Sequence, residues 1–315
     1  MEHTGSSNKR VLVIGSAGLD IIARPQLAIE EGVSCPAYVR TSFGGVSRNI
    51  AENLARLGVP VSLMTVVGRD DFGRKLLEHA NGLGIDTHAS IQTDKFNTAC
   101  YLAIVGKDGN LQYGLDDMRA LALLSSEYLK EHQLLFEQAE LVFVDANLSP
   151  VALRTVFSLA RQAGVRVCAD TTSSTLAKRL IPFLPRMHMI TANRLEATVL
   201  CEEKECVTNQ QSALHAARYL ISRGVEAVII PLGAAGVCYA TSEISGHVPA
   251  IRTQVLDPTG AGDALTAAVI FGILNEMTLD EAIRLGVSAA SLTLRHPGTV
   301  FTELSLERLY DELIV

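Results

Sequence analysis

Residues 257–263, with the sequence DPTGAGD, are followed directly by the apolar run 264–269. A glycine turn that leads into an apolar helix leaves several backbone N–H groups without partners. These donors and the helix dipole attract an anion such as phosphate. The carboxylate of Asp263 lies inside this turn, and a base beside an anion-binding turn is what phosphoryl transfer to an alcohol requires. A helix start with a capping glycine and a surface aspartate would leave the same pattern.

Two segments near the N-terminus carry residues suited to binding hydroxyl groups. Gly44 and Gly45 precede an amphipathic segment in which Asn49 comes early, so a ligand could approach the backbone and meet an amide. Asp20 is expected at the end of the first strand segment, where α/β sheets place their ligands. A glycine turn with a helix cap, and a turn aspartate, are the structural alternatives.

Two motifs later in the chain suit phosphate or a metal ion. Asn193 and Glu196 follow an apolar run, and their spacing of three puts both on one face of a helix. An amide and a carboxylate placed there suit hydrated Mg²⁺ and phosphate oxygens, with a helix capping box as the structural alternative. Gly233 and Gly236 form a second glycine turn after another apolar run.

The elements that must position these residues follow from the hydrophobic pattern. Apolar runs of strand length are expected to form strands at residues 11–14, 61–67, 141–144, 165–169, 188–191 and 227–232. Amphipathic segments between them are expected to form helices at residues 46–57, 73–83, 150–163, 194–200 and 212–223. This alternation predicts an α/β fold in which helices cover both faces of a mostly parallel central sheet.

Residues 21–42 and 98–114 interrupt this alternation with strand patterns and no helix. The second segment predicts a β-hairpin with its turn at 107–110. The two segments are expected to pair as a small sheet, a lid beside the main sheet. Residues 1–9 are polar and expected to be frayed. Because the chain has no long linker, low-complexity tract or internal repeat, residues 1–315 are expected to form a single domain.

The composition excludes several classes of protein. Hydrophobic residues make up 48% of the 315 residues and charged ones 19%, which is typical of a well-filled core. A net charge of -7 argues against binding a nucleic-acid polymer. The longest apolar run, 264–274, is far shorter than the roughly 20 residues of a membrane span. The six cysteines include no C-x-x-C pair, which favours reduced thiols and a cytoplasmic protein.

The order of the motifs adds to what each indicates alone. An aspartate after the first strand, G-G-x-x-x-N, N-x-x-E, G-x-x-G and then D-x-x-G-A-G-D resemble the PfkB/ribokinase family of carbohydrate and nucleoside kinases, over nearly the whole chain. The resemblance implies a ribokinase-like three-layer fold and an ATP- and Mg²⁺-dependent phosphotransferase with an alcohol acceptor. It implies that Asp263 is the catalytic base and that Gly260, Ala261 and Gly262 form the anion hole. Pro258 departs from the family pattern and removes one N–H before the turn.

The resemblance also implies binding roles for the other motifs and a monovalent cation such as K⁺ as a further candidate cofactor. The implied residues are Asp20, Gly44, Gly45 and Asn49 for sugar hydroxyls, Asn193 and Glu196 for Mg²⁺ and phosphate, and Gly233, Gly236, Gly260 and Gly262 for the nucleotide.

Within the family, segment 44–55, GGVSRNIAENLA, is most similar to the pseudouridine kinase branch, in which Arg precedes the Asn and N-I-A follows. Segments 116–118, 126–129 and 145–149 resemble the same branch. This similarity implies phosphorylation of the 5′-hydroxyl of pseudouridine. A kinase for another nucleoside or sugar and a non-catalytic nucleoside-binding regulator are the alternatives. The intact Asp263 turn argues against the regulator.

Pseudouridine has an additional ring N–H where uridine has a carbon, so an enzyme that prefers it should place a polar partner there. Asp117 and Asn147 are the candidates, because both are expected where the sheet ends meet the lid. Capping a turn and capping a helix are their structural alternatives. The exposed face of the lid, and the family resemblance, predict a homodimer formed through the lid.

Overall fold

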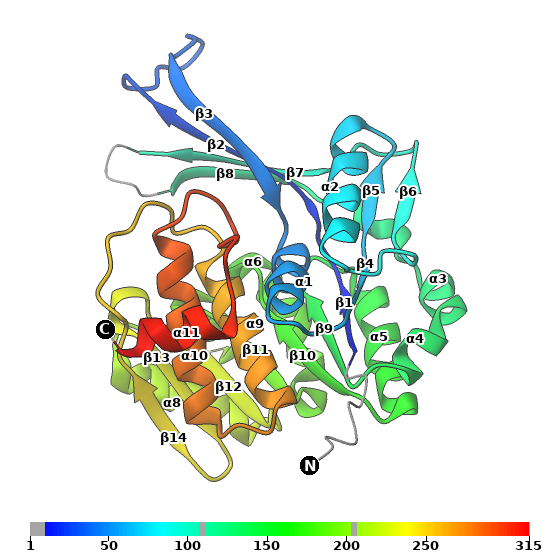
Figure 1. Ribbon diagram of the computed structural model, residues 1–315, viewed down its shortest axis with the longest axis vertical. Helices are drawn as coiled ribbons and strands as arrows, with labels where there is room; N and C mark the ends of the chain where they lie inside the picture. Colours follow the sequence, from blue (N-terminus) through cyan, green and yellow to red (C-terminus); the bar gives the residue numbers. More distant parts are fainter. Residues whose placement is uncertain (1–9, 107–110, 203–206, 315) are drawn as a thin grey trace.

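The computed structural model describes residues 10–106, 111–202 and 207–314, with an eight-stranded sheet at its centre (Figure 1). In space the strands follow the order β14, β13, β12, β11, β10, β9, β1, β4. Neighbouring strands from β12 to β4 are parallel, whereas β13 and β14 add an antiparallel edge. Their bounds are β1 (Val11–Ile14), β4 (Val61–Met64), β9 (Leu141–Asp145), β10 (Arg166–Asp170), β11 (Met189–Thr191), β12 (Ala227–Pro231), β13 (Val237–Thr241) and β14 (Ser245–Val248).

Helices cover both faces of this sheet because successive strand side chains point to opposite sides. In β1, Leu12 and Ile14 belong to one hydrophobic core, and Val11 and Val13 belong to the other. The first core is closed by α3 (Ser126–Glu131), α4 (Gln133–Glu137), α5 (Pro150–Ala163), α6 (Ser174–Ala177), α7 (Arg194–Leu200), α8 (Gln210–Ser222) and the 3₁₀ segments η1 (Arg119–Leu123) and η2 (Lys178–Arg186). The second is closed mainly by α1 (Val46–Arg56), α9 (Ala261–Leu274), α10 (Leu279–Leu294) and α11 (Leu306–Ile314). The three-layer α/β fold predicted from the sequence is confirmed.

The single strand predicted at residues 61–67 is wrong. The chain leaves the main sheet after Met64 and continues as β5 (Val66–Gly68), which pairs with β6 (Ile91–Thr93) in a separate two-stranded sheet. Thr65 lies at the break, and its carbonyl accepts a hydrogen bond from the N–H of Ile91 at 2.8 Å. Helix α2 (Asp71–Gly82) follows β5. Both strands are fully buried, so the apolar pattern runs through the break without a signal.

The small sheet predicted from the two interrupting segments is present and extends away from the helices (Figure 1). Its strand order is β3, β2, β7, β8. The strands are β2 (Gly18–Pro25), β3 (Ala37–Gly44), β7 (Ala99–Val105) and β8 (Leu111–Asp117), and the last two form the predicted hairpin. The predicted turn at 107–110 and the predicted frayed N-terminus at 1–9 lie outside the described residues.

The two faces of the small sheet differ in chemistry. One cross-strand row joins Asp20 to Tyr101 and Tyr101 to Asp116. The next row, on the other face, joins Ile21 to Leu102 and Leu102 to Leu115. The sheet therefore presents a polar face to one side and an apolar face to the other.

Two absences concern the described residues alone. Among the cysteines in the described ranges, Cys35, Cys100, Cys168 and Cys238 are free thiols. Within these ranges, helices that combine the length and the hydropathy needed to cross a membrane do not occur.

Candidate active site

Asp263 lies in the first turn of α9, directly after the glycine turn. Gly260 caps this helix in the left-handed conformation, at φ 80°. The backbone of Thr299 packs so closely against Gly260 that a Cβ at residue 260 would overlap its carbonyl oxygen, whereas a Cβ at Gly262 would meet nothing within 4 Å. The turn is thus held from one side and open at Gly262, as an anion site at a helix start requires.

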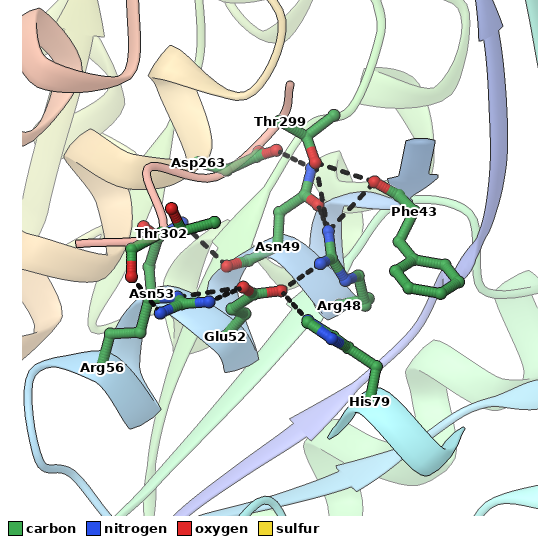
Figure 2. Close-up of polar contacts among 10 residues, drawn as sticks. All are labelled: Phe43, Arg48, Asn49, Glu52, Asn53, Arg56, His79, Asp263, Thr299 and Thr302. Carbon is green, nitrogen blue, oxygen red and sulfur yellow. Dashed lines mark hydrogen bonds and ion pairs between the residues drawn. The ribbon is translucent and has the colours of Figure 1, made fainter. Parts of the chain in front are cut away.

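The Asp263 carboxylate meets the first helix of the chain across the site. Nδ2 of Asn49 donates a hydrogen bond to Oδ2 of Asp263 at 2.7 Å (Figure 2). The pKa of Asp263 is raised to about 7, chiefly by burial and also by the charges of Asp20 and Asp145, while the Asn49 hydrogen bond and the charge of Arg48 oppose the rise. A carboxyl group with this pKa can take up a proton near neutral pH, which is the property expected of a general base.

Asp20 is buried and lies within β2, one of the two inner strands of the small sheet, and the prediction that it ends the first strand is wrong. Gly44 pairs with Gly18, two residues before Asp20, and a Cβ at residue 44 would overlap the Asp20 carboxylate. Burial raises the pKa of Asp20 to about 6, with Arg48 opposing the rise. Gly45, the N-cap of α1, has φ 94°, and a Cβ there would come within 2.6 Å of the backbone of Ser16. The two glycines therefore make room for a carboxylate and a tight turn.

Asp145, a residue without a predicted role, ties the centre of the site together. It ends β9 and is fully buried. Its Oδ2 accepts hydrogen bonds from the hydroxyls of Ser16, at 2.6 Å, and Ser47, at 2.8 Å. These serines follow β1 and open α1, so the carboxylate fixes the segments on both sides of Asp20. The sequence signal for Asp145 is an aspartate at the carboxyl end of a buried strand.

Asn193 and Glu196 form a complete capping box at the start of α7. Oδ1 of Asn193 accepts from the N–H groups of Leu195 and Glu196. Glu196 accepts from the backbone N–H and the amide of Asn193, at 2.8 and 2.6 Å, and from the hydroxyl of Thr171 at 2.6 Å. A carboxylate has about four lone-pair positions, so Glu196 keeps one for another partner.

Near the same site the pKa of Asp170 is raised well above its usual range, chiefly by burial and then by the nearby charges of Glu196 and Asp263. This group of carboxylates suits a cation bound through water. Among the described residues, however, the geometry offers no group of three or more acidic, His or Cys side chains that could hold a metal directly.

Gly233 begins the short 3₁₀ turn η3 (Gly233–Ala235) between β12 and β13, and Gly236 directly follows it. Both have positive φ, at 64° and 90°. A Cβ at Gly236 would overlap the carbonyl of Val248, whereas Gly233 faces open space. The close backbone of Val248 therefore explains why residue 236 is a glycine. Gly233 instead leaves a surface that a ligand could approach.

The predicted base-reading residues line one cavity of about 910 Å³. Asp117 reaches it from the end of β8 and Asn147 from the loop after β9, and Tyr101, the cross-strand partner of Asp20, lines it as well. Asp117 also forms an ion pair with Arg119 at 2.6 Å, and hydrogen bonds from Arg119 lower its pKa to about 2. The N-cap of α5 is Ser149, so Asn147 does not cap that helix.

Two arginines reach the site from unexpected places. Arg40 in β3 forms an ion pair with the buried carboxylate of Asp257, which opens the DPTGAGD segment. Arg48, next to Asn49, is itself buried. The sequence around each arginine does not predict these partners, because they lie far away along the chain.

The chain is similar to known proteins over most of its length. Residues 8–305 match the pfkB family of carbohydrate kinases. The chain is 29% identical to the pseudouridine kinase of Escherichia coli (strain K12), over 94% of each chain. It is 25% identical to the ribokinase of Haemophilus influenzae, over 92% of this chain and 94% of that one. The structure of Arabidopsis thaliana ribokinase complexed with ribose and ATP superposes with a TM-score of 0.84 at 22% identity, covering 98% and 99% of the two chains.

The fold, with its mostly parallel central sheet and small second sheet, is that of the ribokinases and related sugar kinases. The chain belongs to the pfkB family of carbohydrate kinases. It is a carbohydrate or nucleoside kinase, a phosphotransferase with an alcohol acceptor.

Proposed function

We propose that this kinase transfers the γ-phosphoryl group of ATP to the 5′-hydroxyl of pseudouridine, giving pseudouridine 5′-phosphate and ADP. The observation that carries the nucleoside assignment is the polar row Asp20–Tyr101–Asp116, which runs from the Asp263 end of the site to the cavity of about 910 Å³. A free pentose would not extend into such a cavity, whereas a base attached to the sugar would. The similarity to an E. coli pseudouridine kinase favours the same substrate.

In this proposal Asp263 takes the proton of the 5′-hydroxyl as the new O–P bond forms and the bond between the γ-phosphorus and its bridging oxygen breaks. The backbone N–H groups at Gly260, Ala261 and Gly262 would hold the transferring phosphoryl group at the start of α9. Asp20 and Asn49, beside Gly44 and Gly45, would bind the ribose hydroxyls.

The nucleotide would lie along Gly233 and Gly236, towards the start of α7. Glu196 has one open lone-pair position, which fits a water molecule of hydrated Mg²⁺. Both oxygen lone pairs of Asn193 are used, so its remaining amide hydrogen fits a phosphate oxygen better than its oxygen fits a metal. When bound, Mg²⁺ supplies positive charge that offsets the charge of the phosphates. A monovalent cation such as K⁺ stays a prediction from the resemblance.

A substrate panel tests the assignment. Rates with pseudouridine, uridine, adenosine and ribose, each with Mg²⁺ and ATP, should give the highest kcat/KM for pseudouridine. A preference for ribose or adenosine would refute pseudouridine as the substrate but would leave the assignment as a kinase unchanged. Binding of nucleosides without turnover of any of the four would favour the regulator.

The residues of the cavity give a finer test. Asp117→Ala and Asn147→Ala should each be compared for the ratio of kcat/KM with pseudouridine to kcat/KM with uridine. A residue that pairs with the additional ring N–H should lower this ratio when removed, because uridine cannot make that bond. Ratios equal to the wild-type value in both variants would show that neither residue reads the base.

We further propose a homodimer formed through the apolar face of the small sheet. Val39, Ala23, Ile104 and Tyr113 form one cross-strand row there, and Val39 and Tyr113 are 62% and 60% exposed. An uncovered apolar face of this kind is commonly closed by a partner. Light scattering should show a dimer that Tyr113→Lys weakens, and a monomer for the wild type at assay concentration would refute it.

A further inference from the structure

Arg48 lies at the centre of a buried polar network beside the candidate active site (Figure 2). Its side chain is 6% exposed and forms an ion pair with Glu52. Nη1 donates to the carbonyl of Phe43 at 3.0 Å, to Oδ1 of Asn49 at 2.7 Å and to the hydroxyl of Thr299 at 3.1 Å. A buried guanidinium is stable only where acceptors surround it, and here they come from separate parts of the chain.

Each of these acceptors belongs to a different part of the site. Phe43 directly precedes Gly44, at the end of the small sheet. Thr299 packs its backbone against Gly260 in the anion-binding turn. Asn49 contacts Asp263. Arg48 therefore connects the substrate side, the turn and the carboxylate.

The contact with Asn49 decides which way its amide points. A guanidinium can only donate hydrogen bonds, so it must face the oxygen of the amide. With Oδ1 held by Arg48, Nδ2 is directed at Asp263, 2.7 Å away. Turned by half a rotation, the amide would present its oxygen to the carboxylate, and the two would repel each other.

The orientation of the Asn49 amide matters because several charged groups near Asp263 affect its pKa. Asp20 and Asp145 raise the pKa of Asp263, and Asp170 interacts with it as a further nearby carboxylate. The hydrogen bond from Asn49 and the charge of Arg48 lower that pKa. Arg48 opposes protonation of Asp263 directly, and also through the amide it orients.

Helix α1 and helix α2 hold Arg48 in place through Glu52, which is 2% exposed. Glu52 also accepts from Arg56, at 2.7 Å, and lies 3.1 Å from Nε2 of His79. Hydrogen bonds from His79 and Arg56 and the charge of Arg48 outweigh burial and lower the pKa of Glu52 to about 2. Glu52 therefore remains an anion at any pH at which the enzyme is assayed.

We propose that Arg48 is a positioning residue for phosphoryl transfer, which fixes the amide of Asn49 so that Asp263 is held in place and kept ionised. This inference rests on the proposed role of Asp263 as the base. Arg48 itself reaches the reaction only through Asn49 and through its charge.

Arg48→Met and Arg56→Met form a matched pair, because both remove a cation from Glu52 and only Arg48 contacts Asn49. In Arg48→Met, the acid limb of the pH profile of kcat/KM for the nucleoside should move up by about one unit, so kcat/KM should fall about fivefold at pH 7. The deficit should then shrink towards pH 9, with KM for ATP unchanged. Arg56→Met should keep the wild-type acid limb. Equal acid limbs in the two variants would overturn the proposal.

Should Arg48→Met fail to fold, Arg48→Gln takes its place, since it removes the charge and keeps a polar side chain. The same upward shift is expected, and an unshifted limb overturns the proposal. A double-mutant cycle adds a second requirement: in an Asn49→Leu background, Arg48→Met should shift the limb less than it does in the wild type. Fully additive shifts would show that Arg48 does not act through Asn49.

A carboxyl titration without substrate separates this inference from the proposed function. In protein labelled with ¹³C at the aspartate carboxyl groups, the signal missing in Asp263→Asn identifies Asp263. Its pKa should be higher in Arg48→Met than in wild type, and an equal value would refute the positioning role. Full activity of Asp263→Asn would instead remove the base assignment, whatever the titration shows.

Discussion

Two carboxylates of the candidate site, Asp263 and Glu196, are held in contrasting ways. Asp263 accepts one hydrogen bond from a neighbouring side chain, that of Asn49, and other carboxylates lie near it. Glu196 accepts three hydrogen bonds, two of them from Asn193 in its own helix cap. The first carboxylate can gain and lose a proton near neutral pH, whereas the second is fixed in orientation by its three donors.

This difference matches two chemical tasks. A base must change its protonation state during the reaction, so surroundings that raise its pKa help it. A group that orients a hydrated metal ion must keep its place, so donors that fix its orientation and leave one lone-pair position open help it. The comparison leads to four predictions, which begin with the residue whose loss should matter most.

Asp263→Asn should lower kcat by at least about 10²-fold, the usual range for a lost general base. The substitution keeps the shape of the side chain and an oxygen that can accept from Asn49, so folding and nucleoside binding should be preserved. Calorimetric titration with nucleoside and a thermal melt are the controls. Near-normal turnover in the folded variant would remove the distinction between the two carboxylates.

The raised pKa of Asp263 predicts a pH profile. Since the base works only when ionised, kcat/KM should fall about tenfold per unit below a limb near pH 7. The folding stability should depend on pH in the opposite direction to kcat/KM. An acid whose folded pKa lies above its unfolded value loses folding stability as pH rises from about 4 to 7. Asp263→Asn should therefore melt at a higher temperature than the wild type at pH 8. A kcat/KM that stays flat down to pH 5 would contradict the first expectation.

The sequence could predict the Glu196 end of this comparison and only part of the Asp263 end. The capping box joins residues three apart, so the spacing of Asn193 and Glu196 already specifies it. The contact between Asn49 and Asp263 spans 214 positions of the chain. Its existence depends on how α1 packs against α9, which no local pattern specifies.

The same reasoning explains what was right and wrong in the fold. Alternating apolar runs and amphipathic segments specify the three layers, because each layer depends on local periodicity. The break at Thr65 depends on pairing with Ile91 in another strand, and the burial of Asp20 depends on the small sheet. Arg48 and Asp145 contact residues far away in the sequence, so their residue types alone do not predict their roles in the site.

Gly44→Ala should displace the Asp20 carboxylate, near Asp263, without removing any functional group. The added Cβ would overlap the Asp20 carboxylate and displace it. Misplacement of a binding group by a fraction of an ångström should raise KM for the nucleoside by about tenfold or more, with KM for ATP little changed. Gly82→Ala is the matched control, because a Cβ there meets nothing within 4 Å. Equal nucleoside KM values in the two variants would show that Asp20 does not bind the substrate.

Glu196→Gln should give the smallest effect and tests the other end of the comparison. Glutamine can keep the capping box, because it still accepts from the N–H of Asn193, but it loses the charge that holds a hydrated cation. The Mg²⁺ concentration for half-maximal rate should therefore rise by several-fold to about tenfold, with nucleoside KM unchanged.

Glu281→Gln provides the matched control for this substitution, since Glu281 forms the same kind of capping box with Thr278 at the start of α10. Both variants should lose similar, small amounts of thermal stability, and Glu196→Gln alone should change the Mg²⁺ dependence. If both variants merely melt earlier and share the wild-type Mg²⁺ dependence, Glu196 is a helix cap. The charge of the phosphates would then have to be offset elsewhere in the site.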